Sequence, residues 1–158
     1  MKVLNVLIVS LFVFLLAAPV YADTATDYID NEIAEWTDIA NNDGFNILDT
    51  YSGEIGMEYI TYELELAPGV YHFYGSGGEN ITDLDIYIYG QDGMPINSDS
   101  LPDKIPIVVI NLNERAIVSV QLTAYSFTPG SSRGLYCVLV TCENEGEVIS
   151  MVKETAGV

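Results

Sequence analysis

Hydrophobic and polar residues follow two different periods along the chain. Over residues 26–41, apolar side chains recur every three or four positions, and acidic side chains lie largely on the opposite face: Ile29, Ile33, Trp36 and Ile39 or Ala40 against Asp27, Asp30, Glu35 and Asp38. This period predicts one amphipathic helix. Asn41-Asn42-Asp43-Gly44 follows it, and Gly44 suits the left-handed conformation that ends many helices.

Beyond residue 44 the pattern is typical of β-strands. The clearest run is residues 58–66, where one face carries Ile60, Tyr62, Leu64 and Leu66 and the other carries Thr61, Glu63 and Glu65. Similar runs occupy residues 45–52, 70–74, 83–89, 95–97, 105–112, 116–125 and 135–142, with turn-forming residues between them. Because no long helical crossover joins these eight strands, the pattern predicts an antiparallel β-sandwich or barrel.

The two ends of the chain have their own patterns. Lys2, an apolar run over residues 3–16 and the sequence Val20-Tyr21-Ala22 together predict a signal peptide over residues 1–22, with cleavage before Asp23. The apolar run is shorter than the ~20 residues that span a bilayer. We therefore expect a secreted or periplasmic protein, with a helical segment at residues 23–43 and a sandwich at 44–142. Residues 143–158 form an acidic tail that either continues the sheet as an edge strand or folds as a short helix.

Charge narrows the classes of partner. The chain of 158 residues contains 23 Asp and Glu but only 5 Lys and Arg, for a formal net charge of -18. Nucleic-acid recognition needs clustered basic residues, and an anionic membrane surface would repel this chain. Extracellular proteins, polysaccharides and cations remain as partners.

The two cysteines lie five residues apart on one predicted strand. At ~3.3 Å per residue, the Cα atoms of Cys137 and Cys142 would stand ~16 Å apart with side chains on opposite faces. A disulfide needs Cα atoms within ~7 Å. We expect Cys137 to be buried and unpaired.

Three segments resemble the bacterial pre-peptidase C-terminal domain family. They are Asp83-Leu84-Asp85-Ile86-Tyr87-Ile88-Tyr89 with the following Asp92-Gly93 and Asn97-Ser98-Asp99, the turn Leu66-Ala67-Pro68-Gly69-Val70-Tyr71, and the closing Gly134-Leu135-Tyr136. The resemblance spans residues 59–140. It implies a secreted, jelly-roll-like antiparallel β-sandwich of about eight strands, in a family whose members often accompany proteases and in several cases bind calcium or extracellular polymers. No protease domain accompanies the sandwich in this sequence.

Acidic side chains near the Asp-x-Asp strand suggest a cation site. Asp83 and Asp85 lie two residues apart, so both point to the same face, while Leu84, Ile86 and Ile88 point to the core. Two such carboxylates can share a calcium ion if loops add further oxygens, for which Asp99 and Asp103 are the candidates. The alternative is an ordinary solvated strand face.

Tyr87 and Tyr89 continue that face and form a candidate ligand surface, because sugar-binding surfaces combine aromatic rings with carboxylates. The alternative is that β-propensity and cross-strand packing alone account for these tyrosines, as is common on strand faces. The only histidine, His72, lies between Tyr71 and Phe73 in a predicted strand, and no Gly-x-Ser-x-Gly elbow accompanies it, so we expect a structural histidine and no nucleophilic catalysis. A glycoside hydrolase that uses a pair of carboxylates is the enzymatic alternative.

The sequence thus favours a secreted, non-enzymatic binding or interaction module of this β-sandwich type, with calcium as a candidate cofactor. Two alternatives stay open. One is a carbohydrate-binding or carbohydrate-cleaving protein, and the other is a structural component of a surface or matrix that assembles in the presence of calcium.

Overall fold

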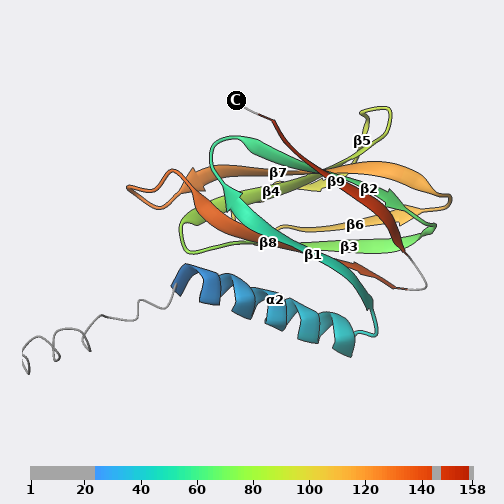
Figure 1. The fold of residues 1–158 in the computed structure, drawn as a ribbon, viewed down its shortest axis with the longest axis horizontal. Helices are drawn as coiled ribbons and strands as arrows, with labels where there is room; N and C mark the ends of the chain where they lie inside the picture. Colours follow the sequence, from blue (N-terminus) through green and yellow to red (C-terminus); the bar gives the residue numbers. More distant parts are fainter. Residues whose placement is uncertain (1–23, 144–146, 157–158) are drawn as a thin grey trace, which may run out of the picture.

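Two antiparallel sheets stack face to face, and one helix lies against the outside of one of them (Figure 1). The computed structural model describes residues 24–143 and 147–156. In chain order their elements are α2 (Thr24–Asn42), β1 (Asn46–Ile55), β2 (Tyr59–Leu66), β3 (Gly69–Gly77), β4 (Ile81–Gly90), β5 (Pro95–Asp99), β6 (Ile107–Leu112), β7 (Ala116–Phe127), β8 (Gly134–Cys142) and β9 (Val148–Ala156). The predicted signal peptide lies outside the described residues.

The strand pairing is that of a jelly roll. The four-stranded sheet has the order β1-β8-β3-β6, and the five-stranded sheet has the order β5-β4-β7-β2-β9. The pairs β1 with β8, β2 with β7, β3 with β6 and β4 with β5 are therefore nested inside one another, as when one long hairpin is rolled into two sheets. The predicted antiparallel sandwich, preceded by a helix, is confirmed.

A ninth strand extends the sandwich. Residues in the acidic tail form β9, which pairs antiparallel with β2 and places Met151 opposite Leu64. Within the described residues β9 is the outermost strand of its sheet, and Ile149, Met151 and Val152 stay substantially exposed. Of the two conformations that the sequence left open for this tail, the structure has the strand.

Strand alternation produces the core between the sheets. In β2 the side chains of Ile60, Tyr62, Leu64 and Leu66 are buried, whereas Tyr59 and Glu63 are exposed. Leu84, Ile86 and Ile88 of β4 are fully buried in the same cluster. The hydroxyls of Tyr62 and Tyr136 hydrogen-bond to each other across the two sheets, which satisfies two polar groups inside the apolar layer.

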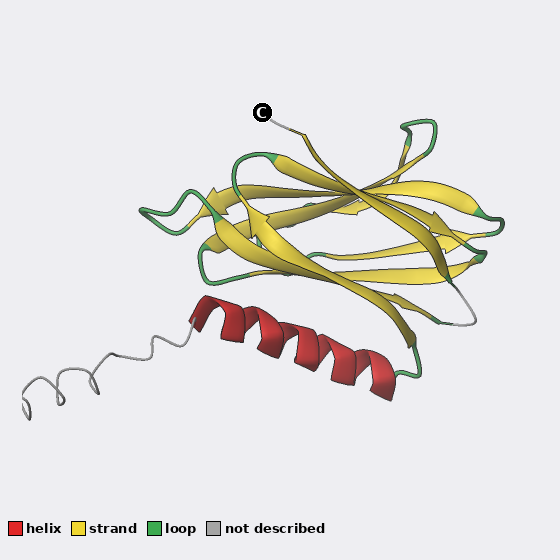
Figure 2. Ribbon diagram, in the orientation of Figure 1, coloured by secondary structure: helices red, strands yellow, loops and turns green. Residues whose placement is uncertain are grey.

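The helix α2 covers the outer face of the four-stranded sheet (Figure 2). Ala40 is fully buried against Tyr74 and Leu139, and the ring of Trp36 stacks on Tyr74 with centroids 5.0 Å apart. Ser76 Oγ donates a hydrogen bond to Glu32 Oε2 at 3.0 Å. The helix face that the sequence predicted to be apolar is therefore the face that packs on the sheet.

The cysteines lie on opposite faces of β8, as their spacing predicts. Both are free and buried. Cys142 belongs to the core between the sheets, whereas Cys137 alternates with core residues and lies on the helix side, near Glu32. Burial raises the pKa of the Cys137 thiol to about 12. Among the helices of the described residues, none has the length and apolarity that a bilayer crossing requires.

Two local departures from the predicted strands affect the region near Asp83 and Asp85. The pairing of β4 with β7 contains a bulge. Two residues, Thr82 and Asp83, therefore separate the buried Ile81 and Leu84, whereas regular alternation would place one residue between them. The strand expected over residues 105–112 begins at Ile107, although the carbonyl of Pro106 still accepts a hydrogen bond from Gly75 N at 2.8 Å. The carbonyl of Asp103 likewise accepts from Leu84 N at 2.8 Å, so the loop before β6 is held against β4.

Candidate functional site

The outer face of the five-stranded sheet is open, in contrast to the face under the helix. No other described element lies over it, as Figure 2 shows. Its outward side chains come from β4, β7 and β2, in register. Tyr89, Ser119 and Glu63 form one row across the three strands, and Tyr87, Gln121 and Thr61 form the next.

A hollow of about 420 Å³ lies on this face. Ser119 and Gln121 form its floor, because β7 lies between β4 and β2 in the sheet. Tyr89 and the residues of the turn after β4 form one wall, and β2 forms the other. The complete lining is Tyr59, Thr61, Glu63, Tyr89, Gly90, Gln91, Gly93, Ser119 and Gln121.

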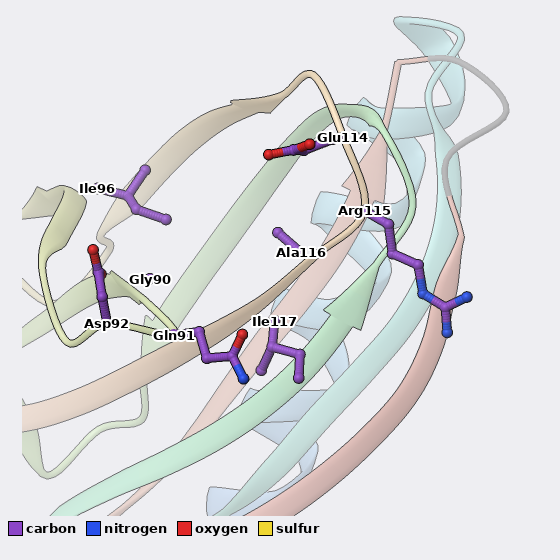
Figure 3. Close-up of a pocket in the computed structure, with 8 residues that line it drawn as sticks. All are labelled: Gly90, Gln91, Asp92, Ile96, Glu114, Arg115, Ala116 and Ile117. Carbon is purple, nitrogen blue, oxygen red and sulfur yellow. The ribbon is translucent and has the colours of Figure 1, made fainter.

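A second depression of about 550 Å³ adjoins the hollow and shares Gly90 and Gln91 with it. Figure 3 shows its lining, which comes from the turn after β4, from Ile96 of β5 and from the turn before β7. The Arg115 side chain points away from the other lining residues in this view, and its guanidinium pairs with Glu65 at 2.6 Å. Its positive charge is thus already matched by a carboxylate.

Asp85 is a buried acid on the same sheet face. Its side chain is only 4% exposed, and Tyr87 donates a 2.7 Å hydrogen bond to its Oδ2. Because the Tyr87 hydrogen is used in this way, Tyr125 donates to Tyr87 across 3.3 Å. Burial raises the pKa of the Asp85 carboxyl, the hydrogen bond from Tyr87 opposes the rise, and repulsion from Asp83, Asp99 and Asp103 adds to it.

The four acids predicted to bind a cation are neighbours, but they differ in their hydrogen bonds. Asp99 accepts from Leu101 N and Ile107 N through its two oxygens, at 3.2 and 3.0 Å. Asp103 accepts from Ile105 N at 2.8 Å. Asp83 Oδ1 and Asp85 Oδ1, by contrast, are buried and lack a hydrogen-bond partner within the described structure. Among all the residues that the structure describes, no group of three or more acids, histidines or cysteines is arranged to hold a metal ion.

The two predicted ligand-surface tyrosines lie side by side on β4. The Tyr87 and Tyr89 rings stack with centroids 6.5 Å apart and planes 22° apart, and both side chains are half-buried. Hydrogen bonds with Tyr125 and Asp85 raise the pKa of Tyr87. Tyr89 lines the hollow, whereas Tyr87 is tied to Asp85 beside it.

His72 is remote from this face. It belongs to β3 in the other sheet, where its ring packs against Phe45 at 4.5 Å. Its Nε2 lies 2.9 Å from Glu143 Oε1, and its Nδ1 lies 3.4 Å from the Tyr74 hydroxyl. These contacts place the ring in a packed and hydrogen-bonded structural setting.

Sequence reasoning missed Tyr59, Glu63, Ser119 and Gln121 as site residues. Their meeting depends on the register of β4, β7 and β2, which join segments far apart in the chain. One signal was present, because Ser119, Gln121 and Thr123 alternate with Val118, Val120 and Leu122. That alternation marks an outward row of small polar side chains on a central strand.

No family model matches the chain, and no curated protein matches it in sequence. Among solved structures, it is similar to the pre-peptidase C-terminal domain of a Bacillus anthracis collagenase, with 14% identity, a TM-score of 0.47, and coverage of 60% of this chain and 90% of that one. It is also similar to PliG of Aeromonas hydrophila, a periplasmic inhibitor of g-type lysozyme, with 11% identity, a TM-score of 0.44, and coverage of 63% and 88%. The jelly-roll description rests on the strand pairing given above.

Proposed function

We propose that this chain is a secreted or periplasmic, non-enzymatic binding module of the pre-peptidase C-terminal type, and that its ligand face is the open outer face of the five-stranded sheet. The signal peptide predicted from the sequence supports export. The resemblance of the three segments supports the pre-peptidase C-terminal type. The observation that carries the binding role is the difference between the sheets. One outer face is covered by α2, and the other presents half-buried and exposed tyrosines around a polar hollow.

The composition of the hollow favours binding over hydrolysis. Cleavage of a glycosidic bond ordinarily uses two carboxyl groups on either side of the bond. Among the described residues that line the hollow, Glu63 is the single acid. The carbohydrate-cleaving alternative predicts new reducing ends when polysaccharide is incubated with the protein, and the binding proposal predicts none.

Calcium at the Asp83 and Asp85 end of β4 is part of the proposal. Two buried carboxylate oxygens without hydrogen-bond partners are costly in an apolar environment, and a bound cation would satisfy both. Asp99 and Asp103 would add negative charge nearby, since their oxygens are engaged with backbone N–H groups. Backbone carbonyls and water would have to complete the six to eight oxygens that calcium takes.

Titration calorimetry in ~0.15 M sodium chloride tests the cation, because that salt largely screens diffuse attraction to an acidic surface. We expect saturable binding of calcium in preference to magnesium, and ~2.7 kcal/mol of added stability at 100 times the dissociation constant. Asp85→Asn should abolish both effects, and the exposed Glu63→Gln should abolish neither. The absence of saturable binding in the parent protein would remove calcium from the proposal.

Co-sedimentation with insoluble extracellular polymers tests the ligand face. Collagen, cellulose, chitin and peptidoglycan form the panel. Ser119→Trp places a large ring on the floor of the hollow, and Glu35→Trp places the same ring on the exposed side of α2. We expect Ser119→Trp alone to reduce retention of the protein on the polymer that it binds. Retention by no polymer, or loss only with Glu35→Trp, would contradict the proposal.

A further inference from the structure

We infer that the hollow over β7 binds a neutral polysaccharide chain. This inference rests on the proposed binding function and adds the chemical class of the ligand. Its site residues are Tyr59, Glu63, Tyr89, Ser119 and Gln121, which come from three adjacent strands. Shape, hydrogen-bonding groups and charge each support that class of ligand.

The shape of the hollow suits an extended chain. β4 and β2 each lie one strand from β7, so the two walls stand about 9–10 Å apart at the backbone. The outward row Ser119, Gln121 and Thr123 runs along β7 for four residue steps, or ~13 Å, and its first two residues line the hollow. The depression beyond Gly90 and Gln91 opens one end. A ligand can therefore enter at one end and lie along the strand, as a polymer must.

Aromatic rings stand on both walls. Tyr89 is held by its stacking on Tyr87, and Tyr59 on the β2 wall is 38% exposed. A tyrosine presents an apolar ring face together with a hydroxyl, so it can contact the C–H face of a sugar and hydrogen-bond its hydroxyls. Because Tyr89 is already packed against its neighbour, little side-chain entropy remains to be lost when a ligand binds.

The polar groups match hydroxyl groups. Glu63 accepts hydrogen bonds, Gln121 both donates and accepts, and the Ser119 and Thr61 hydroxyls do the same. Gln121 Nε2 lies 3.3 Å from Thr123 Oγ1, a long contact that a ligand could replace. All of these groups are side chains on a sheet face, where the backbone N–H and C=O groups are used in strand pairing. A peptide would find no free strand edge inside the hollow.

The charged residues in and around the hollow favour a neutral polymer over an ionic one. No Lys or Arg lines the hollow in the described structure, and Arg115 in the adjoining depression is paired with Glu65. The net charge of -18 would repel uronic-acid polymers, for which the hollow offers no counter-charge. A cationic peptide is the main competitor, because Glu63 lines the hollow and Asp92 and Glu114 line the adjoining depression.

Affinity gel electrophoresis of the purified protein is the test. Gels contain a soluble β-glucan, xylan or galactomannan as neutral probes, polygalacturonate as the anionic probe, or poly-lysine as the cationic one. We expect a neutral probe to retard the protein equally at 0.05 and 0.5 M salt, and polygalacturonate to have no effect. Retardation that occurs only with poly-lysine, persists in ~0.15 M salt and is lost in Ser119→Trp would replace the sugar with a basic peptide.

Variants locate the binding. Tyr89→Ala should weaken affinity about tenfold through loss of the ring contact, and Ser119→Trp should remove binding by filling the floor. Tyr28→Ala is the matched control, because Tyr28 lies on α2, which packs on the other sheet, and does not line the hollow. Melting curves check that each variant is folded. Neutral binding that survives both Tyr89→Ala and Ser119→Trp would overturn the site.

The two proposals can fail separately. If no neutral polysaccharide retards the protein but Ser119→Trp still reduces retention on collagen or another non-glycan polymer, the ligand face stands and the sugar inference is wrong. If no probe or polymer responds to a change in the hollow, both are wrong.

Discussion

The outer faces of the two sheets carry different side chains although the same fold produces both. Under α2, the outward residues of β3 and β8 include Tyr74, Cys137 and Leu139, which are buried. On β7 of the other sheet the outward residues are Ser119, Gln121 and Thr123, which stay partly exposed. A covered sheet face needs apolar residues, and an open face tolerates polar ones. The outward residues of a central strand thus indicate whether its face is covered.

The most disruptive changes lie in the core between the two sheets. Leu84→Asp and Ile86→Asp should each prevent folding, because both side chains are fully buried and an unpaired buried carboxylate costs several kcal/mol out of a total stability of ~5–15 kcal/mol. Circular dichroism and thermal melting measure this. Glu63→Gln, on the outward face, should change stability by no more than about 0.5 kcal/mol. A melting temperature for Ile86→Asp equal to that of the parent would show that the inner and outer faces are exchanged.

Removing the aromatic ring under the helix should have the next largest effect. Trp36→Ala deletes a half-buried ring that stacks on Tyr74, so we expect a loss of about 2–3 kcal/mol in the free energy of unfolding. Urea denaturation gives the value. A loss below about 0.5 kcal/mol would mean that α2 adds little to stability and that the four-stranded sheet is effectively open too.

Thiol alkylation can detect separation of the helix from the sheet. In the native protein both cysteines should react slowly, since burial hides them and raises the pKa of Cys137 to about 12, which leaves little thiolate at pH 8. Trp36→Ala should speed labelling of Cys137 about 30-fold by easing local opening, and Cys142 in the core should be much less affected. Peptide mass spectrometry after pulsed alkylation separates the two sites. Equal acceleration at both would mean that helix and sandwich open together.

The open face should be the most tolerant of change. Tyr59→Ala removes a ring from the wall of the hollow, yet we expect a stability change of at most about 1 kcal/mol, because the side chain is 38% exposed and no helix covers it. The same urea experiment used for Trp36→Ala provides a direct comparison between the faces. A larger loss at Tyr59 than at Trp36 would mean that the open face contributes more to stability than the face under α2.

Periodicity predicted the parts of the fold in which one side is buried and the other wet. The run Ile60, Tyr62, Leu64 and Leu66 is buried as its alternation indicated. The sequence could not decide the conformation of the tail, because within the described residues β9 has a partner strand on one side only, and such a strand shows little contrast between its faces. The bulge before Leu84 also has no local signal, since Thr82 and Asp83 resemble ordinary outward residues.

The site was less predictable than the fold. The sequence placed Asp83, Asp85, Tyr87 and Tyr89 on one strand, and the structure shows that Asp85 is almost fully buried and hydrogen-bonded to Tyr87. The hydrogen bond from Tyr87 and the closeness of Asp99 and Asp103 cannot be inferred from the Asp-x-Asp spacing. The hollow needs three strands in register, which is tertiary information.

The nested strand pairs also set an order of assembly. β4 and β5 are joined by residues 91–94 alone, so this hairpin can close first at little entropic cost. Each later pair encloses the previous one, so closure in order of loop length brings β1 to β8 after the other three nested pairs, with Asn46 opposite Cys142. In this order the surface on which α2 rests is completed only after the other nested pairs have formed, although α2 precedes every described strand in the chain. Pairing between strands so far apart in the chain slows folding. Because α2 contacts both β1 and β8, the helix stabilises the pairing of these two strands.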